Sequence, residues 1–349
     1  MHPSTFILKK TMKPNIFDIS TKELSQDAFL TWLILWADKE ATQYDNELHK
    51  CGINFVKELI LKEIPSFSDE IISVRAGRQW ENIDVWAEVN DKYLIIIEDK
   101  TYSGQHSGQL MRYKSTAEKW CNNQNPKYLP PVCIYLKTGN ESQQSLNKVT
   151  EEGFKIYNRQ EFIDLLNNHN LKNDIYNDFK QRIVRIEKVN NEWENKEIKI
   201  WNGNDWQGFF QFLEKEINLM GWNYVNNPNG GFWNAVINWN YWGIYPAYLQ
   251  IEEFKLCFKV STDPEEVDIP ENVSRGEIRN KISDLILNCA IKKGITTIRK
   301  PYRFGNGKYM KVAVVDRENW LGNKNEKVDK KKVVEQLLFY KNFLLEIIN

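Results

Sequence analysis

The most constraining feature of the sequence is the segment YLIIIEDK at residues 93–100, in which three consecutive isoleucines run into two carboxylates and an ammonium group. A short run of β-branched residues next to a turn predicts a buried strand. Side chains alternate between the faces of a strand, so Ile96, Glu98 and Lys100 share one face. Asp99 lies on the other face. We therefore expect a rigid apolar strand that holds charged side chains in a fixed direction at its end.

A further carboxylate precedes this strand, in the segment NIDVWAEV at residues 82–89. A tight two-residue turn would pair Asp84 with Ile97 and place Asp84 and Glu98 on opposite faces. A three-residue loop at 90–92 would pair Asp84 directly with Glu98. The longer loop, or a bulge, is required if the two carboxylates act together.

Asp84, Glu98 and Lys100 suit phosphoryl chemistry. Hard divalent cations such as Mg²⁺ bind through one or two carboxylates together with water and substrate phosphate. A lysine beside the metal can stabilise charge that develops on phosphorus, or help to orient and deprotonate the attacking water. The alternative interpretation of the same residues is a solvated strand end with an ordinary charged cluster.

The order of predicted elements in the first half is α-α-β-β-β-α-β-β-α, which favours a mixed sheet flanked by helices, an α/β architecture. Ser20 and Glu23 have the spacing of a capping box and predict that the first helix begins at Ser20. The remaining helices are expected near 46–63, 107–122, 161–169 and 174–189, and the strands near 70–77, 82–89, 92–100, 130–139 and 154–158.

A polar segment without periodicity, at residues 188–205, indicates a domain boundary. We expect a first domain over 1–190 and a second, α+β domain over 191–349 that serves substrate binding, regulation or dimer contacts, with a homodimer as one possible assembly. Its helices are expected near 206–217, 272–293 and 327–348, and its strands near 231–240, 245–254, 255–261 and 308–316.

Composition excludes several classes of protein. The 47 basic residues balance 47 acidic ones, so no overall charge points to a polyanion partner. Five scattered cysteines predict reduced thiols in a cytoplasmic protein, and four scattered histidines argue against a zinc site or a Ser-His-Asp triad. No apolar run reaches the ~18 residues of a membrane span.

Asp84 followed by Glu98-Asp99-Lys100 resembles the D…(D/E)xK signature of the PD-(D/E)XK nuclease superfamily, which has the restriction-endonuclease-like fold. Gln109 and Tyr113 fit the QxxxY motif of its RecB-like members. The resemblance extends over roughly residues 15–190 and departs from the pattern in having no proline before Asp84, where Asn82-Ile83 stand.

The resemblance implies a role for each matched residue. Asp84 and Glu98 would bind Mg²⁺, or Mn²⁺ in its place, with the backbone carbonyl of Asp99 as a third ligand. Lys100 would act on the nucleophilic water. Glu23, which stands where the first-helix glutamate of the family is expected, would complete the metal shell. Gln109 and Tyr113, which share one helix face, would hydrogen-bond the phosphate or order the active-site side chains.

Other interpretations stay open for several of these residues. Glu23 could serve only as a capping-box residue, and Tyr113 only as a packing residue. Asp27, one helical turn after Glu23, is expected to be solvated, and His106 is expected to be a loop residue without a role in the site.

The stretch 275–311 carries ten basic residues against two acidic ones, with aromatic residues among them. Basic loops with interleaved aromatics suit contact with phosphates and stacking on bases. The candidate nucleic-acid-binding residues are Arg299, Lys300, Arg303, Lys308 and Lys311. A solvated charged surface is the alternative.

Together these features predict a metal-dependent nuclease that hydrolyses phosphodiester bonds of nucleic acid, DNA being the expected substrate, with defence against foreign DNA as a setting by analogy. A non-catalytic nucleic-acid-binding protein and a ligand- or partner-sensing protein with the same fold are the competing hypotheses.

Overall fold

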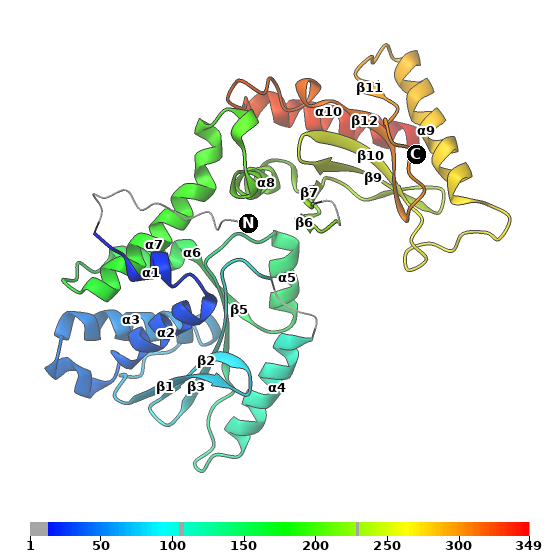
Figure 1. Ribbon diagram of the computed structural model, residues 1–349. Helices are drawn as coiled ribbons and strands as arrows, with labels where there is room; N and C mark the ends of the chain where they lie inside the picture. Colours follow the sequence, from blue (N-terminus) through cyan, green and yellow to red (C-terminus); the bar gives the residue numbers. More distant parts are fainter. Residues whose placement is uncertain (1–12, 105–107, 228–229, 349) are drawn as a thin grey trace. The chain divides into compact units, whose positions relative to one another are not determined.

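The computed structural model describes residues 13–104, 108–227 and 230–348 (Figure 1). His106 lies outside the described residues. The chain divides into two compact units. Unit 1 comprises Met1–Gly139 and Leu146–Glu187, and unit 2 comprises Asn140–Ser145 and Lys188–Asn349.

Unit 1 contains a five-stranded mixed sheet in the order β1-β2-β3-β4-β5. The first three strands are antiparallel, whereas β4 and β5 run parallel to β3. Parallel neighbours need a crossover connection, and between β4 and β5 the chain forms the helix α5 (Gln143–Glu151), which the sequence did not predict. The strands are β1 Val74–Trp80, β2 Ile83–Val89, β3 Tyr93–Lys100, β4 Val132–Lys137 and β5 Lys155–Asn158.

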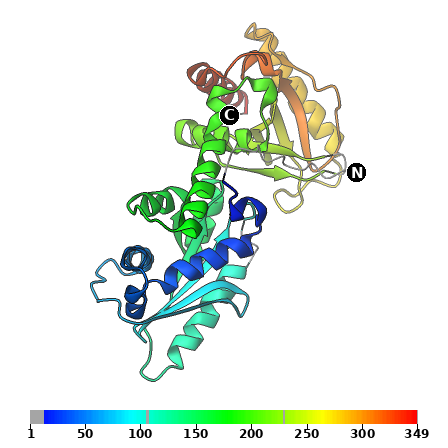
Figure 2. The same cartoon turned by 60° about the vertical axis from the view of Figure 1, so that its left-hand side comes forward.

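Helices cover both faces of this sheet (Figure 1 and Figure 2). Ile95 and Ile97 face a core shared with α2, α3, α6 and α7, while Leu94 and Ile96 face a smaller core shared with α4. The predicted mixed α/β sheet flanked by helices is confirmed. The helices are α1 Ile16–Ile19, α2 Glu23–Leu35, α3 Asn46–Glu63, α4 Gln109–Asn122, α6 Arg159–Asn167 and α7 Asp174–Asn191, with a short 3₁₀ helix at Lys39–Gln43.

The predicted capping box at the first helix is wrong. A short helix, α1, ends at Ile19 with Ser20 as its C-cap residue, and α2 begins only at Glu23, with Lys22 as its N-cap residue. The Ser20 hydroxyl lies 2.5 Å from the hydroxyl of Ser25. The Glu23 carboxylate is therefore available for contacts outside its own helix.

Unit 2 contains a seven-stranded antiparallel sheet in the order β11-β12-β10-β9-β7-β6, with β8 paired to β9. The predicted α+β architecture of this region is confirmed, although β6, β8 and β11 were not predicted as separate strands. The strands are β6 Gly221–Val225, β7 Phe232–Val236, β8 Asn240–Trp242, β9 Tyr245–Glu252, β10 Lys255–Ser261, β11 Ile298–Arg299 and β12 Tyr309–Val315, and the helices are α8 Gly203–Ile217, α9 Arg275–Lys292 and α10 Lys330–Ile348.

The polar segment before α8 forms two 3₁₀ helices, Glu192–Asn195 and Ile198–Ile200, with buried side chains. Trp193, Ile198 and Trp201 all lie in the apolar core of unit 2. Among the described residues, no helix combines the length and apolar character needed to cross a membrane.

Candidate active site

The register of the β2–β3 hairpin brings Asp84 opposite Glu98. The ladder pairs Val89 with Tyr93 and Val85 with Ile97, and the same register continued by one residue places Asp84 opposite Glu98. Residues 90–92 form the loop: Asn90 and Asp91 have φ of 56° and 49°, and the Lys92 N–H closes the turn on the Val89 carbonyl at 3.1 Å. The prediction that converging carboxylates require a three-residue loop is confirmed.

Lys100 lies between the two carboxylates at the end of β3. Its Nζ is 3.5 Å from Oδ2 of Asp84 and forms a shorter ion pair with Oε1 of Glu98. Asp84 Oδ2 also accepts the backbone N–H of Asp99 at 3.0 Å, which fixes the carboxylate against the end of the strand. The Glu98 side chain is 1% exposed, so this cluster is not a solvated strand end.

The first turns of α4 contribute hydrogen bonds to Glu98. Gln109 Nε2 donates to Glu98 Oε1 at 2.9 Å and to the hydroxyl of Tyr113 at 2.8 Å. Residues four apart share a helix face, which explains why the QxxxY spacing places both groups together. Tyr113 is buried, and its ring packs in the core between β3 and α4, so it both packs and contacts the polar cluster.

Glu23 is held beside the cluster by the segment that follows β3. Its Oε1 accepts the N–H of Thr101 at 2.9 Å and the hydroxyl of Ser103 at 3.1 Å. The N-terminus of α2 is thereby joined to the end of β3. These bonds place Glu23 near Lys100, whose positive charge it stabilises.

Asp99 points away from Glu98, to the face covered by α2, as strand alternation predicts. Its Oδ1 accepts Gln26 Nε2 at 2.5 Å, and the same amide donates to Thr138 Oγ1 at 3.0 Å. Asp27 is buried beside it, so the expectation of a solvated Asp27 is wrong. The sequence did not identify Gln26 as a residue that contacts Asp99. Its position one helical turn after Glu23 could have indicated that it faces the same strand end.

The electrostatics of the site follow from burial and from the crowding of like charges. Burial, assisted by the charge of Asp84, raises the pKa of Glu98 to about 7. Burial also raises the pKa of Asp27 to about 6 and that of Asp99 well above its usual value. For Lys100, burial opposes the charged form, but Glu98, Asp84 and Glu23 outweigh it and raise the pKa, so the side chain is an ammonium group.

The donor atoms fit a hard divalent cation that shares its coordination with substrate. Oε2 of Glu98 is buried and has no hydrogen-bond partner among the described residues, so it offers an unpaired oxygen atom to a cation. Within the described ranges, no group of three or more His, Cys, Asp or Glu side chains is arranged to hold a metal ion. Mg²⁺ commonly uses only one or two protein carboxylates and takes its other ligands from water and phosphate.

The five basic candidates of unit 2 do not form one cluster. Arg299, Arg303 and Lys311 line a common pocket together with Lys255 of β10. Lys308 instead pairs with Asp263 at 3.0 Å, and Lys300 lies over the ring of Phe304 at 4.6 Å. The sequence interpretation missed Lys255 because it lies in a mainly acidic stretch more than forty residues earlier.

Comparison with protein families agrees with this geometry. The family model of the PD-(D/E)XK nuclease superfamily matches residues 14–201, which is more than half of the 349-residue chain. The chain therefore belongs to the PD-(D/E)XK nuclease superfamily. This membership implies nuclease activity, and nucleases of the superfamily generally use divalent metal ions. No curated protein and no solved structure matches the chain.

Proposed function

We propose that the protein is a Mg²⁺-dependent nuclease that hydrolyses phosphodiester bonds of DNA, with Mn²⁺ able to replace Mg²⁺. The observation that carries the proposal is the convergence of Asp84, Glu98 and Lys100 at one end of β3, with an unpartnered carboxylate oxygen on Glu98. A degenerate member of the fold has no need to keep two carboxylates and a lysine in contact.

In this proposal Asp84, Glu98 and the carbonyl of Asp99 hold the ion. A bound divalent cation polarises the phosphate and lowers the pKa of a bound water. Because Lys100 is an ammonium group, it suits the stabilisation of negative charge and the orientation of water better than proton abstraction.

The remaining site residues act as positioning residues. Gln109 fixes Glu98 Oε1 and leaves Oε2 without a hydrogen bond, so that Oε2 would be available to a bound ion, and the hydroxyl of Tyr113 fixes the Gln109 amide. Glu23 holds the segment after Lys100 through Thr101 and Ser103.

Three finer points belong to the same proposal. Nucleic-acid binding involves the basic residues Arg299, Lys300, Arg303, Lys308 and Lys311. This is supported by the pocket that Arg299, Arg303 and Lys311 line together. A cytoplasmic location is supported by the five free cysteines. Defence against foreign DNA is the setting that a DNA-cleaving activity would serve.

The proposal is tested by cleavage of linear duplex, closed circular and single-stranded DNA, with RNA in parallel, in Mg²⁺, Mn²⁺ or EDTA. We expect cleavage with either metal, none in EDTA, and none from Asp84→Asn. Asp91→Asn, an exposed carboxylate in the turn of the same hairpin, is the matched control and should cleave normally. Failure of the folded wild type to cut any substrate, or cutting that persists in EDTA, would rule the proposal out.

Cleavage should also depend on pH through Glu98. A raised pKa of about 7 means that protons compete with the metal for this carboxylate near neutral pH. At a limiting Mg²⁺ concentration the rate should rise as the pH increases through about 7, and a higher Mg²⁺ concentration should move the midpoint to lower pH. Initial rates between pH 5.5 and 8.5 at two metal concentrations test this; a midpoint insensitive to Mg²⁺ would contradict it.

A further inference from the structure

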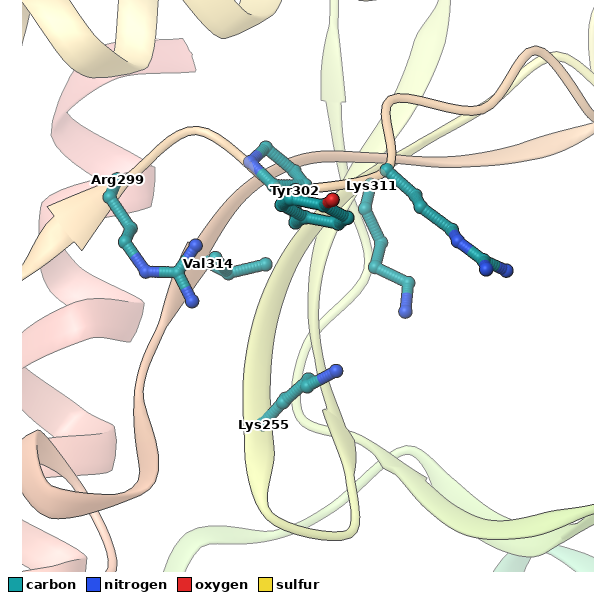
Figure 3. Close-up of a pocket in the computed structure, with 7 residues that line it drawn as sticks. Lys255, Arg299, Tyr302, Lys311 and Val314 are labelled. Atoms are coloured by element: carbon teal, nitrogen blue, oxygen red, sulfur yellow. The ribbon is translucent and has the colours of Figure 1, made fainter.

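A pocket of about 320 Å³ in unit 2 gathers an unusual number of cations (Figure 3). Figure 3 shows the side chains of Lys255, Arg299 and Lys311 extending toward a common space, with the Tyr302 ring beside it. The lining residues are Lys255 of β10, Arg299 of β11, Pro301, Tyr302 and Arg303 of the following loop, and Lys311 and Val314 of β12.

A β-bulge places two of the lining residues on the same side of β12. The pairing of β10 with β12 runs Lys259↔Lys311 and then Phe258↔Ala313, so Val312 is an extra residue in β12. Because a bulge inserts one extra residue, the side chains that follow it point to the opposite face of the sheet from the one that simple alternation would give. Lys311 and Val314, three residues apart, therefore both line the pocket, while Val312 and Ala313 both face the apolar core.

Two of the four cations are held by buried or partly buried carboxylates. Lys311 pairs at 2.5 Å with Glu252, which is buried and also contacts Lys259 at 3.0 Å. Arg299 makes two hydrogen bonds to Asp316, at 2.7 and 2.5 Å. These contacts fix the positions of Lys311 and Arg299 without a ligand.

The other two cations are not neutralised. Neither Lys255 nor Arg303 forms an ion pair with a residue in the part of the chain that the structure describes. The charge of Lys255 is a minor cause of the lowered pKa of Asp316, whose main cause is the hydrogen bond from Arg299. Like charges drawn into one pocket repel each other, so the pocket favours an anion that bridges them.

Tyr302 supplies a stacking surface at the same place. The residue is 97% exposed, which is unusual for an aromatic residue and leaves the face of the ring open. Pro301 precedes it and restricts the backbone at the start of the loop. An exposed ring beside cations is the arrangement that binds a base and its phosphate together.

We propose that this pocket binds one phosphorylated nucleoside, with the phosphate between Lys255 and Arg303 and the base on Tyr302. Its volume is at the lower end of the ~300–1,000 Å³ of small-ligand pockets, which suits a single nucleotide. The nucleotide is either free or the 5′-phosphorylated end of a single strand. The inference does not depend on cleavage, because none of these residues belongs to the Asp84–Glu98 site.

Calorimetric titration of the full chain in EDTA tests this without cleavage. The probes are the four nucleoside 5′-monophosphates, the four nucleosides, inorganic phosphate, and a short oligothymidylate with and without a 5′-phosphate. We expect at least one nucleotide to bind more tightly than its nucleoside and than inorganic phosphate. Lys255→Gln, Arg303→Gln and Tyr302→Ala should each raise its Kd by about tenfold or more.

Lys332→Gln removes an exposed lysine of α10 and is the matched control, with an unchanged Kd expected. Asp84→Asn should also bind normally, which separates this proposal from that of cleavage. Preference for the free nucleotide or for the phosphorylated strand end identifies the source, and either supports the pocket. Absence of binding by every nucleotide, binding no tighter than that of inorganic phosphate, or affinity unchanged in the three pocket variants would overturn it.

Discussion

Replacing Lys100 by methionine should lower the rate of DNA cleavage by about two to four orders of magnitude, the usual range for a group that assists proton transfer or charge stabilisation at the reacting atoms. Methionine keeps most of the apolar stem of this largely buried side chain and removes only the charge. Glu98 then loses its closest cation. Since its pKa is already about 7, it can take up a proton instead of leaving a buried charge unpaired.

Single-turnover rates at saturating Mg²⁺ measure this effect. Lys92→Met is the matched control, because Lys92 lies in the turn of the same hairpin and pairs with Asp69 at 2.7 Å outside the site. The circular dichroism spectra of both variants should match that of the wild type. A Lys100→Met rate within a few-fold of the control would remove Lys100 from the reaction.

Lys100→Arg separates the two roles that the sequence left open for Lys100, namely stabilisation of charge and deprotonation of the attacking water. Arginine keeps the positive charge at any accessible pH but cannot act as a base. If Lys100 stabilises charge, the arginine variant should retain much more activity than Lys100→Met. Equal loss in both variants would instead indicate that the amine itself must give up a proton.

The polar end of β3 could be predicted because its determinants are local. The alternation of Ile96, Glu98 and Lys100 depends only on strand geometry, and the loop at 90–92 fixes the partner of Glu98 within one hairpin. Helical spacing likewise predicts that Gln109 and Tyr113 share one helix face, whereas their place in the site was implied by the family resemblance. Each of these inferences needed no knowledge of distant parts of the chain.

What the sequence could not predict depends on contacts between distant segments. Ser20 and Glu23 satisfy a local capping pattern, yet Glu23 bonds to Thr101 and Ser103, nearly eighty residues away. Asp27 has the sequence environment of an exposed helical residue, but it is buried against Asp99. Lys255 joins Lys311 only through the pairing of β10 with β12, which no local pattern reveals.

Trp193 provides the largest expected effect on stability. The polar segment around it predicts a domain boundary, and the division between the two units falls at its start, between Glu187 and Lys188. The Trp193 side chain is 1% exposed and lies in the core of unit 2. Its ring contacts Trp201, Phe209 and Phe212 at centroid distances of 5.8, 5.3 and 5.5 Å. A Cβ on Gly208 would lie 2.7 Å from the same ring, so the indole is packed directly against the backbone of α8.

Trp193→Ala should therefore lower the free energy of unfolding by about 3–5 kcal/mol, the usual cost of removing a large buried aromatic side chain. Urea denaturation followed by circular dichroism measures the change. Tyr241→Ala, at a ring that is 52% exposed on β8, is the control and should cost less than about 1 kcal/mol. If unfolding occurs in two steps, only the step that belongs to unit 2 should shift. Equal costs for the two variants would mean that the segment is a linker in solution, as its composition alone suggests.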